Sequence, residues 1–390
     1  MISVSEALQR VLDLVAPLEF EEVPLTEAAG RVLAVDQIAT RDQPPFAASA
    51  MDGYAILAAD LAVGAKLTVI GEAAAGHRFE TAVLPGQAVR VFTGAPMPDG
   101  ADHVVIQEDV KRVGNEIEIS DGFDRSSYVR PSGGDFRVGM TFGSPRILRP
   151  TDIALLASMN KACLKVTRRP EIAILATGDE LVPPGGHPSP DQIIASNSYG
   201  LKAMIEAQGA RARLLPIARD TEAALIDAFE LAASADLIVT IGGASVGDHD
   251  LVAPTAAKLG MEQAFYKVAM RPGKPLMAGR IGKTPMLGLP GNPVSAMVCG
   301  HVFLKPLIDK MVGLPAEETP TKTATLSRDL GPNGPRAHYM RAHLKGTNIA
   351  PFERQDSSLM SVLAEANALL IRPPSDPARV QGENVTYIPL

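Results

Sequence analysis

Cysteine is scarce in this sequence, and its scarcity excludes two classes of protein. Cys163 and Cys299 are the only cysteines in 390 residues, and neither a Cys-X-X-Cys pair nor a cluster of histidines is present. A disulfide framework or a zinc site cannot be built from such a set. Free cysteines are most often small buried residues, so we expect both side chains to lie in the core.

Blocks of basic residues and long apolar runs are also missing. The formal net charge is −7, and without a basic face a nucleic-acid partner is not expected. No apolar run is long enough to span a bilayer. The N-terminus does not resemble a signal peptide, because residues 3–6 form a capping box and apolar residues follow at helical spacing. We therefore expect a cytoplasmic protein without a membrane partner.

The composition is that of a folded protein with several domains. Hydrophobic residues make up 46% and charged residues 21% of the chain, which excludes wholesale disorder. A chain of 390 residues is too long for one ordinary core, so two to four domains are expected.

The first third of the chain predicts a domain that is interrupted by another. Residues 47–136 contain short β-like runs separated by Gly and Pro, such as 66–71, 87–93 and 103–107. Helical patterns precede this stretch and return after it. We predict a split N-terminal α/β linker domain, formed by residues 1–46 and 137–168, and an inserted β domain formed by residues 47–136.

Strands and helices alternate in residues 169–313. Strands are predicted at 171–176, 212–217, 236–241, 264–270 and 285–289, and helices at 198–207, 221–233, 251–259 and from 293 towards 312. This alternation predicts a doubly wound α/β domain with a mostly parallel sheet. Residues 314–390 return to β-like runs, at 321–326, 338–344, 368–371 and 384–388, which favours a small barrel or sandwich.

Ligands of open α/β sheets bind where loops leave the carboxyl ends of the strands. The loop of residues 242–250 follows a predicted buried strand, and its three glycines would let backbone N–H groups approach a phosphate. A plain turn is the alternative, because a glycine-rich loop alone is a weak signal. Asp248 and Asp250 favour the phosphate interpretation, since carboxylates beside a phosphate indicate Mg²⁺.

A second loop combines two cations with two prolines. Pro272 and Pro275 restrict the backbone, so Arg271 and Lys274 are held as a pair that suits an oxyanion. Lys267 lies four residues before Arg271, and a polar residue on the solvated side of a strand is the alternative there.

The third loop, residues 289–295, joins a strand to a helix. The helix N-terminus has unsatisfied N–H groups and a partial positive charge that suit an anion. Ser295 is either a ligand or a capping or surface hydroxyl. Glu180 is either a ligand of metal or ribose or a bare surface carboxylate, and Asp220 is either functional or a cap of the next helix. Together the loops indicate a phosphorylated ligand handled with Mg²⁺, but they do not separate a phosphotransferase from a hydrolase or a binder.

Six motifs in order give the sequence a family resemblance. They are residues 44–55 with Ser49-Ala50-Met51-Asp52-Gly53-Tyr54-Ala55, Phe92-Thr93-Gly94-Ala95, Thr177-Gly178-Asp179-Glu180-Leu181, Gly242-Gly243-Ala244-Ser245-Val246-Gly247, Pro272-Gly273-Lys274-Pro275, and Gly288-Leu289-Pro290-Gly291-Asn292-Pro293. Over essentially its whole length the chain resembles the MoeA family of molybdopterin molybdenumtransferases, to which the E domain of gephyrin is related.

This resemblance implies a homodimer of four-domain subunits that end in a β-barrel. The α/β domain would be of the type found in molybdopterin adenylyltransferases, with which transient contact is expected. Its active cleft would face the inserted β domain of the partner subunit. The implied reaction is the final step of molybdenum cofactor biosynthesis: the Mg²⁺-dependent insertion of molybdate into adenylylated molybdopterin, with release of AMP.

The resemblance also implies three sets of site residues. The catalytic set is Asp52, Thr93, Asp135, Glu180, Asp220 and Asp250, of which Asp52, Glu180 and Asp250 would hold the metal. The substrate-binding set is Thr177, Gly178, Gly242, Gly243, Ser245, Gly247, Lys267, Pro290, Gly291 and Asn292. The molybdate-binding set is Arg271, Lys274, Ser295, Arg341 and Ser361. Many relatives have Lys in place of Arg271, a change that keeps the charge but alters the geometry offered to an oxyanion.

Two other functions are weighed against this one. A stand-alone adenylyltransferase would use the same α/β domain but lacks the extra β domains. A receptor scaffold like gephyrin would have a linker and a fused second α/β domain, which this sequence lacks. The retained acidic residues favour an enzyme.

Overall fold

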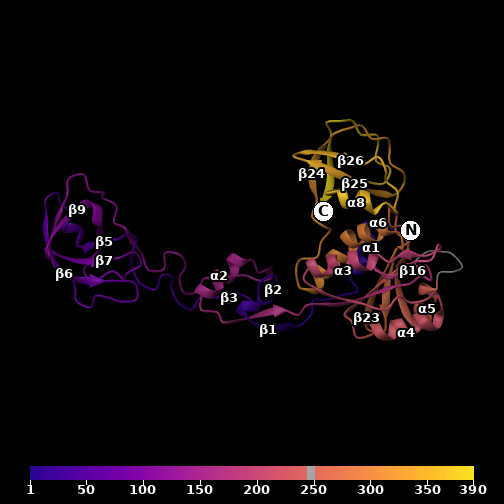
Figure 1. Cartoon of the computed structure of the whole chain (residues 1–390), viewed down its shortest axis with the longest axis horizontal. Coiled ribbons are helices and arrows are strands. Elements are labelled where there is room, and N and C mark those ends of the chain that lie inside the picture. Colours follow the sequence, from indigo (N-terminus) through magenta and orange to yellow (C-terminus); the bar gives the residue numbers. More distant parts are fainter. Residues whose placement is uncertain (244–250) are drawn as a thin grey trace.

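The computed structural model describes residues 1–243 and 251–390, so the predicted site residues Ser245, Gly247, Asp248 and Asp250 lie outside the described residues. The chain is elongated (Figure 1): a β unit lies at one end, a small mixed unit in the middle, and an α/β domain with a second β domain at the other end. Among the helices described, none has the length and apolar character that a membrane span requires.

The β unit at the far end is built on a six-stranded sheet of order β8-β5-β7-β6-β10-β9. Its strands are β5 (Gly53–Ile56), β6 (Lys66–Ala73), β7 (Gln87–Val91), β8 (His103–Ile106), β9 (Val110–Val113) and β10 (Glu116–Ile119), with short 3-10 helices η2 (Ala58–Asp60) and η3 (Gln107–Asp109). Alternate residues of β5 enter separate apolar clusters, Ala55 in one and Tyr54 and Ile56 in the other, so both faces of the sheet are covered. The short strands β4 (Ala48–Ser49) and β11 (Val129–Arg130) pair where the chain enters and leaves the unit.

Segments from before and after the β unit make the middle unit. Its sheet has the order β1-β14-β2-β13, with β1 (Phe20–Pro24), β2 (Val32–Leu33), β13 (Arg146–Ile147) and β14 (Cys163–Thr167). The pair β3 (Gln37–Ile38) and β12 (Thr141–Phe142), the 3-10 helix η1 (Leu25–Glu27) and the helix α2 (Pro150–Ser158) complete it. Cys163 is exposed on β14, so its predicted burial is wrong, whereas the predicted burial of Cys299 is confirmed. Alternation along β14 turns Leu164 and Val166 inward and leaves Cys163 outside.

The first helix, α1 (Val4–Leu12), packs against the α/β domain and not in the middle unit. The Ser3 hydroxyl accepts the Glu6 N–H at 3.1 Å, as expected of the capping box. The helix buries Leu8, Val11 and Leu12 in the same apolar cluster as the α/β domain. The segment predicted as residues 1–46 is therefore divided between two parts of the molecule.

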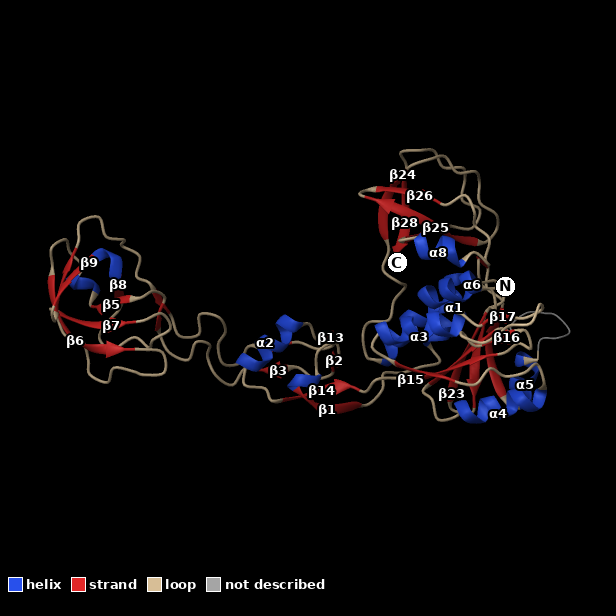
Figure 2. Cartoon of the chain, viewed as in Figure 1, coloured by secondary structure: helices blue, strands red, loops and turns tan. Residues whose placement is uncertain are grey.

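The α/β domain contains the predicted doubly wound sheet, in the order β18-β15-β19-β23-β22-β20. The strands β18 (Arg211–Leu214), β15 (Glu171–Ala176), β19 (Leu237–Ile241) and β23 (Thr284–Leu289) are parallel to one another. Strand β22 (Met277–Ile281) pairs antiparallel with β23 and with the edge strand β20 (Met261–Tyr266), so β20 has the same direction as β23. One face is covered by α1, by α3 (Asn197–Ala207) and by the continuous run of α6 (Pro293–Cys299), η4 (Gly300–Leu304) and α7 (Lys305–Met311). Helices α4 (Glu222–Ala232) and α5 (Val252–Lys258) cover the other (Figure 2).

One predicted strand of this domain is wrong. The strand expected at residues 264–270 ends at Tyr266, because Lys267 has a positive φ of 69° that no strand continues. The chain then forms β21 (Met270–Arg271), which pairs in parallel with β25 of the C-terminal domain. Arg271 thus stands at the junction of two domains.

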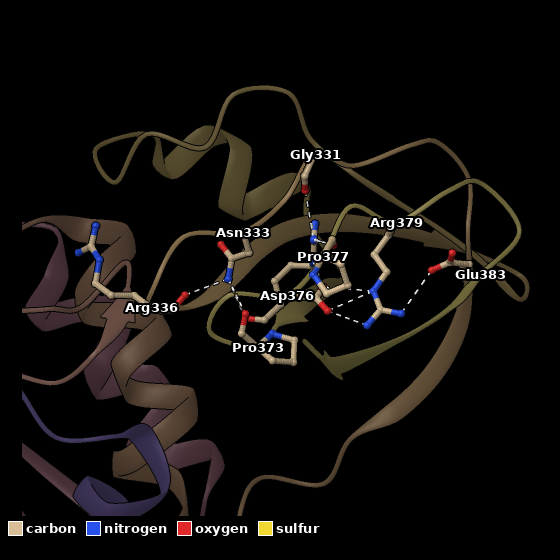
Figure 3. A network of polar contacts seen from close by, with 9 residues as sticks. Gly331, Asn333, Arg336, Pro373, Asp376, Pro377, Arg379 and Glu383 are labelled. Atoms are coloured by element: carbon tan, nitrogen blue, oxygen red, sulfur yellow. Dashed lines mark hydrogen bonds and ion pairs between the residues drawn. The ribbon is translucent and has the colours of Figure 1, made fainter.

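The C-terminal domain is a closed five-stranded barrel, as the sequence predicts. Its strands are β24 (Lys322–Leu326), β25 (Ala337–Lys345), β26 (Asn348–Pro351), β27 (Ala368–Arg372) and β28 (Asn384–Pro389), and α8 (Met360–Glu365) lies beside them. The pairing of β25 with both β26 and β27 closes the ring. Asp376 accepts hydrogen bonds from Arg372 and Arg379, and Arg379 also reaches Glu383 (Figure 3).

Candidate active site

Three loops that leave the carboxyl ends of parallel strands meet around one cavity of about 740 Å³. Thr177 and Gly178 follow β15, Gly242 and Gly243 follow β19, and Pro290 to Asn292 follow β23; all of them line the cavity. Adjacent parallel strands end at the same edge of the sheet, which is why residues more than a hundred positions apart in sequence come together here.

Glycine is favoured in two of these loops, because a side chain there would be strained or would displace its neighbours. A Cβ atom at Gly178 would stand 2.5 Å from a carboxylate oxygen of Glu180, and one at Gly242 would stand 3.1 Å from the Thr177 carbonyl oxygen. Gly242 also has a φ of 88°, a conformation that L side chains rarely adopt. The loops therefore pack closely and leave the Glu180 carboxylate room beside the cavity.

Two predicted carboxylates, Glu180 and Asp220, line the cavity. The buried Thr177 hydroxyl donates a hydrogen bond to Asp220 Oδ1 at 2.8 Å, which fixes that side chain. The alternative in which Asp220 caps the next helix is wrong, because the Thr221 hydroxyl caps α4 by accepting the Ala224 N–H at 3.3 Å. Asp220 is thus free of a helix-capping role and turned to the cavity.

This donor set fits Mg²⁺. Carboxylate oxygens are its preferred protein ligands, and it usually takes one or two of them together with substrate phosphates and water. Within residues 1–243 and 251–390, no three His, Cys, Asp or Glu side chains are grouped closely enough to hold a metal by themselves. Glu180 and Asp220 can therefore supply part of a metal site that a phosphorylated ligand would complete.

Sequence reasoning missed the start of α3 and one residue of the C-terminal domain. Asn197 and Ser198 line the cavity, and Asn197 Nδ2 donates to the Gly291 carbonyl oxygen at 2.7 Å. Ser358 lines the cavity as well. The polar triplet Ser-Asn-Ser at 196–198, before a helical pattern, could have indicated the first pair, but nothing local in the sequence marks Ser358.

The loop between β23 and α6 is held from both sides. Asn197 ties it to α3, while Asn292 Nδ2 donates to the Ser357 hydroxyl at 3.1 Å and the Val294 N–H donates to the Ser357 carbonyl at 3.0 Å. Pro293 occupies the first turn of α6, where its missing N–H costs no hydrogen bond. The C-terminal domain is therefore part of the cavity wall.

The predicted oxyanion residues have different surroundings. Arg271 and Lys274 are exposed, and Pro275 of the same loop lines the cavity. Ser295 is buried in α6, and Ser361 is exposed on α8; neither is among the lining residues. Lys267 is half-buried with its Nζ 4.9 Å from the centre of the Tyr266 ring, and it too is absent from the lining.

Arg341, the remaining predicted oxyanion residue, is completely buried. Its Nη2 donates to the Asp356 carbonyl at 2.9 Å and to the Arg354 carbonyl at 3.3 Å, and in the described part of the chain Nε and Nη1 have no partner. Burial lowers the pKa of Arg341. Burial and the nearby charges of Arg271 and Arg341 likewise lower the pKa of His338 to about 4. The positive charges of Arg271 and Arg341 therefore both act on this junction of two domains.

The predicted residues of the β unit form a separate pair. Asp52 precedes β5, and its Oδ1 accepts the Thr93 N–H at 2.7 Å and the Thr93 hydroxyl at 2.9 Å. These hydrogen bonds, and then the charge of Arg90, lower the pKa of Asp52. Asp135 is exposed on the return to the middle unit, and no hydrogen bond or ion pair between it and Asp52 exists among the residues described. Strands β5 and β7 lie at the opposite end of the molecule from β15 and α6 (Figure 1).

A second cavity of about 710 Å³ adjoins the first. The two share Gly178, Leu181, Ala195 and Ser198 as walls. The second cavity is lined further by Tyr199 and by the apolar residues that follow β18, including Leu215 and Ile217. Together they can accommodate an elongated ligand with two bulky ends.

Known proteins resemble this chain over its whole length. A model of the MoeA N-terminal region (domain I and II) matches residues 2–160, one of a probable molybdopterin binding domain matches 173–310, and one of the MoeA C-terminal region (domain IV) matches 323–390. The molybdopterin molybdenumtransferase of Nostoc is 35% identical, with 100% of this chain and 94% of the relative covered. That of Haemophilus influenzae is 33% identical, with 100% and 98% covered.

Solved structures agree with the sequence relatives. A molybdopterin biosynthesis MoeA protein of Pyrococcus horikoshii has a TM-score of 0.86 and 30% sequence identity, and the superposition covers 100% of this chain and 99% of that one. Full-length identity of this order, a shared fold and three matching domain models in the same order lead to one conclusion: the chain belongs to the MoeA family of molybdopterin molybdenumtransferases, transferases of molybdenum cofactor biosynthesis.

Proposed function

We propose that this enzyme inserts molybdate into adenylylated molybdopterin in a Mg²⁺-dependent reaction that releases AMP. The observation that supports the proposal most is the cavity at the carboxyl edge of the parallel sheet, where close-packed glycine loops, helix N-termini and two carboxylates meet. Such a site suits a pyrophosphate, because backbone N–H groups bind phosphate oxygens and carboxylates bind a bridging metal.

The substrate has two bulky ends, a pterin and an adenosine, joined by a pyrophosphate. The two adjoining cavities suit this shape, and we place the pyrophosphate near their shared wall at Gly178 and Ser198. When bound, Mg²⁺ would neutralise phosphate oxygens and favour departure of AMP. Glu180 would hold the metal together with Asp250, which lies outside the described residues, and with Asp52 of the partner subunit. Asp220, which lines the same cavity as Glu180, would contribute. The substrate would be bound by the glycines of the loop of residues 242–250, together with Thr177, Pro290, Gly291 and Asn292.

Molybdate is a tetrahedral dianion, and the second loop offers it cations in a fixed frame. We propose that Arg271 and Lys274 bind it beside the cavity, with Arg341 and Ser295 behind them. The two unpaired nitrogens of the buried Arg341 support an acceptor in this region, since buried donors without a partner are costly. For the C-terminal hydroxyl we favour Ser358 over the predicted Ser361, because Ser358 lines the cavity. The dithiolene of the substrate would bind the molybdenum, since Cys163 lies on β14 of the middle unit and the buried Cys299 is not among the residues that line the cavity.

The separation of the β unit from the cavity supports a composite site. Strands β5 and β7, which adjoin Asp52 and Thr93 in the sequence, lie at the opposite end of the molecule from α6 (Figure 1), so we propose a homodimer in which each β unit serves the partner's cavity. We further propose that the dimer acts in the cytoplasm, where it receives its substrate by transient contact with the adenylyltransferase.

The test is a defined reaction with purified protein. Adenylylated molybdopterin, MgCl₂ and molybdate would be incubated with the enzyme, and AMP and the molybdenum cofactor would be measured separately. We expect both products, loss of both when Mg²⁺ is chelated, and no cofactor when molybdate is omitted. Intact substrate after incubation with Mg²⁺ and molybdate would disprove the proposal. Transfer of an adenylyl group from ATP to free molybdopterin would identify the rival adenylyltransferase instead.

A further inference from the structure

Among the described residues, the Asp52 carboxylate forms hydrogen bonds through one of its two oxygens. Oδ1 accepts two hydrogen bonds from Thr93, at 2.7 Å from the N–H and 2.9 Å from the hydroxyl. Oδ2 accepts none from the residues described. If Asp52 acts at a composite site, Oδ2 is the oxygen left for the reaction, and its direction depends on the peptide units on either side of Asp52.

Arg90 and Gln107 donate hydrogen bonds to the carbonyl groups of Gly53 and Asp52, respectively. Arg90 lies opposite Tyr54 where β7 pairs with β5. Its Nη1 donates to the Gly53 carbonyl at 3.1 Å, and its Nη2 donates to Gln107 Oε1 at 2.6 Å. The Gln107 N–H in turn donates to the Asp52 carbonyl at 3.0 Å. One guanidinium group therefore ties together the turn that presents Asp52 and the start of η3.

Two aromatic rings hold the Arg90 guanidinium itself. Its central carbon lies 5.0 Å from the centre of the Tyr54 ring and 4.9 Å from that of the Phe92 ring. Phe92 immediately precedes Thr93, the residue that binds Asp52. A planar cation is suited to such a place, because it stacks on rings while its edge donates hydrogen bonds in fixed directions; an ammonium group does not offer both.

We propose that Arg90 is the positioning residue of Asp52. By binding Gly53, Gln107 and the ring next to Thr93, it holds the Asp52–Thr93 pair in one geometry with Oδ2 directed outward. The catalytic consequence rests on the proposed function of Asp52, whereas the structural consequence, a fixed Asp52–Thr93 hydrogen bond, does not. A displacement of about 1 Å at a reacting group is enough to lower turnover by roughly a hundredfold.

The alternative is that Arg90 only stabilises the β sheet. A matched control separates the two roles. Arg125 lies in the same unit and also stacks on a ring, 5.6 Å from the centre of Phe123, and among the described residues it has no hydrogen bond or ion pair with the turn at Asp52. Arg125→Met removes a similar cation from the unit. Arg90→Met removes the hydrogen bonds but keeps apolar contact with the rings, and Arg90→Lys keeps the charge without the planar fork.

The first measurement is amide hydrogen exchange of full-length protein, which does not depend on activity. We expect protection of the Thr93 amide to fall at least about tenfold in Arg90→Met and Arg90→Lys, while the amides of Val89 and Val91 keep theirs, and no change in Arg125→Met. Unchanged Thr93 protection in Arg90→Met would overturn the proposal. An equal loss of protection at Val89 and Val91 would also overturn it, since it would show that Arg90 serves the whole sheet.

The second measurement is steady-state AMP release. We expect kcat of both Arg90 variants to fall roughly ten- to a hundredfold with KM changed less than about threefold, and Arg125→Met to match the wild type. Wild-type kcat in Arg90→Met with Thr93 deprotected would refute the catalytic part of the inference. Absence of AMP release from the wild type would refute the proposed function instead, and the exchange result would still decide the structural part.

Discussion

At the scale of single residues, Asp52 combines partial exposure with a fixed partner. Its carboxylate is half-buried, and Thr93 supplies both of the hydrogen bonds described for it. We expect Asp52→Ala to keep the fold and to lower AMP release by at least roughly a hundredfold. Turnover would be compared with that of Asp121→Ala, an exposed acid of the same unit. Equal turnover of the two variants would count against a catalytic Asp52.

Lys274 tests which anion the proline-bounded loop binds. We expect Lys274→Ala to cleave the adenylylated substrate normally and to insert molybdenum only at raised molybdate, with an apparent affinity roughly ten- to a hundredfold weaker. The reason is that one exposed cation is lost from the oxyanion frame, while the phosphates keep their own ligands around the cavity. Titrating molybdate and substrate independently would check this. A shift in substrate affinity alone would assign the loop to the phosphate.

At the scale of elements, the loop between β23 and α6 depends on Asn197. We expect Asn197→Ala to raise the KM for the adenylylated substrate about tenfold, because the Gly291 carbonyl loses its tie to α3. Asn115→Ala, in the exposed turn between β9 and β10, is the control. The prediction fails if both variants have the wild-type KM.

The barrel depends on the buried Asp376. Hydrogen bonds from Arg379 and Arg372 lower the pKa of its carboxyl. Since the folded pKa is below the unfolded value of about 3.9, this stabilisation is present above that pH and is lost as the pH falls through the lower folded pKa. We expect Asp376→Asn to lower the free energy of unfolding by about 3 kcal/mol at neutral pH, because a buried guanidinium loses its counter-charge.

Denaturant unfolding at several pH values would check the Asp376 prediction. The wild type should lose stability more steeply than Asp376→Asn below about pH 4. Glu383→Gln, which changes a more exposed partner of Arg379, should stay within about 0.5 kcal/mol of the wild type. Parallel pH curves for wild type and Asp376→Asn would contradict the assignment.

Elements with strong local patterns could be predicted from the sequence, and those set by distant contacts could not. The strand at 171–176 is an uninterrupted apolar run after Glu171, and β15 has those bounds. The strand at 264–270 also looked regular, but Lys267 takes a left-handed conformation and β21 pairs with another domain. Likewise the glycine loops could be placed at the site by strand order, whereas Ser358 reaches the cavity only through the docking of the barrel. Tertiary contacts of this kind leave no periodic signal in the chain.

At the scale of the whole molecule, the long separation of Asp52 from Glu180 predicts complementation. Asp52→Ala and Glu180→Ala subunits should each be inactive as homodimers. In a mixed dimer both changes fall in one composite site and the other site stays intact, so about half of the wild-type turnover should return. Differently tagged subunits, purified as verified heterodimers, would give the measurement. Inactive heterodimers would argue that each chain uses its own β unit.

The contacts that hold α1 on the α/β domain determine when this helix can be secured during synthesis. Lys310 Nζ donates to the Leu12 carbonyl across 298 positions, and the Leu18 N–H donates to the Met311 carbonyl. A ribosome adding about 5 to 20 residues per second needs roughly 15 to 60 s to reach that partner. An isolated helix of nine residues is marginal in water. Helix α1 therefore leaves the ribosome long before the residues that secure it, and its apolar face is open to chaperones while the β unit is already folding.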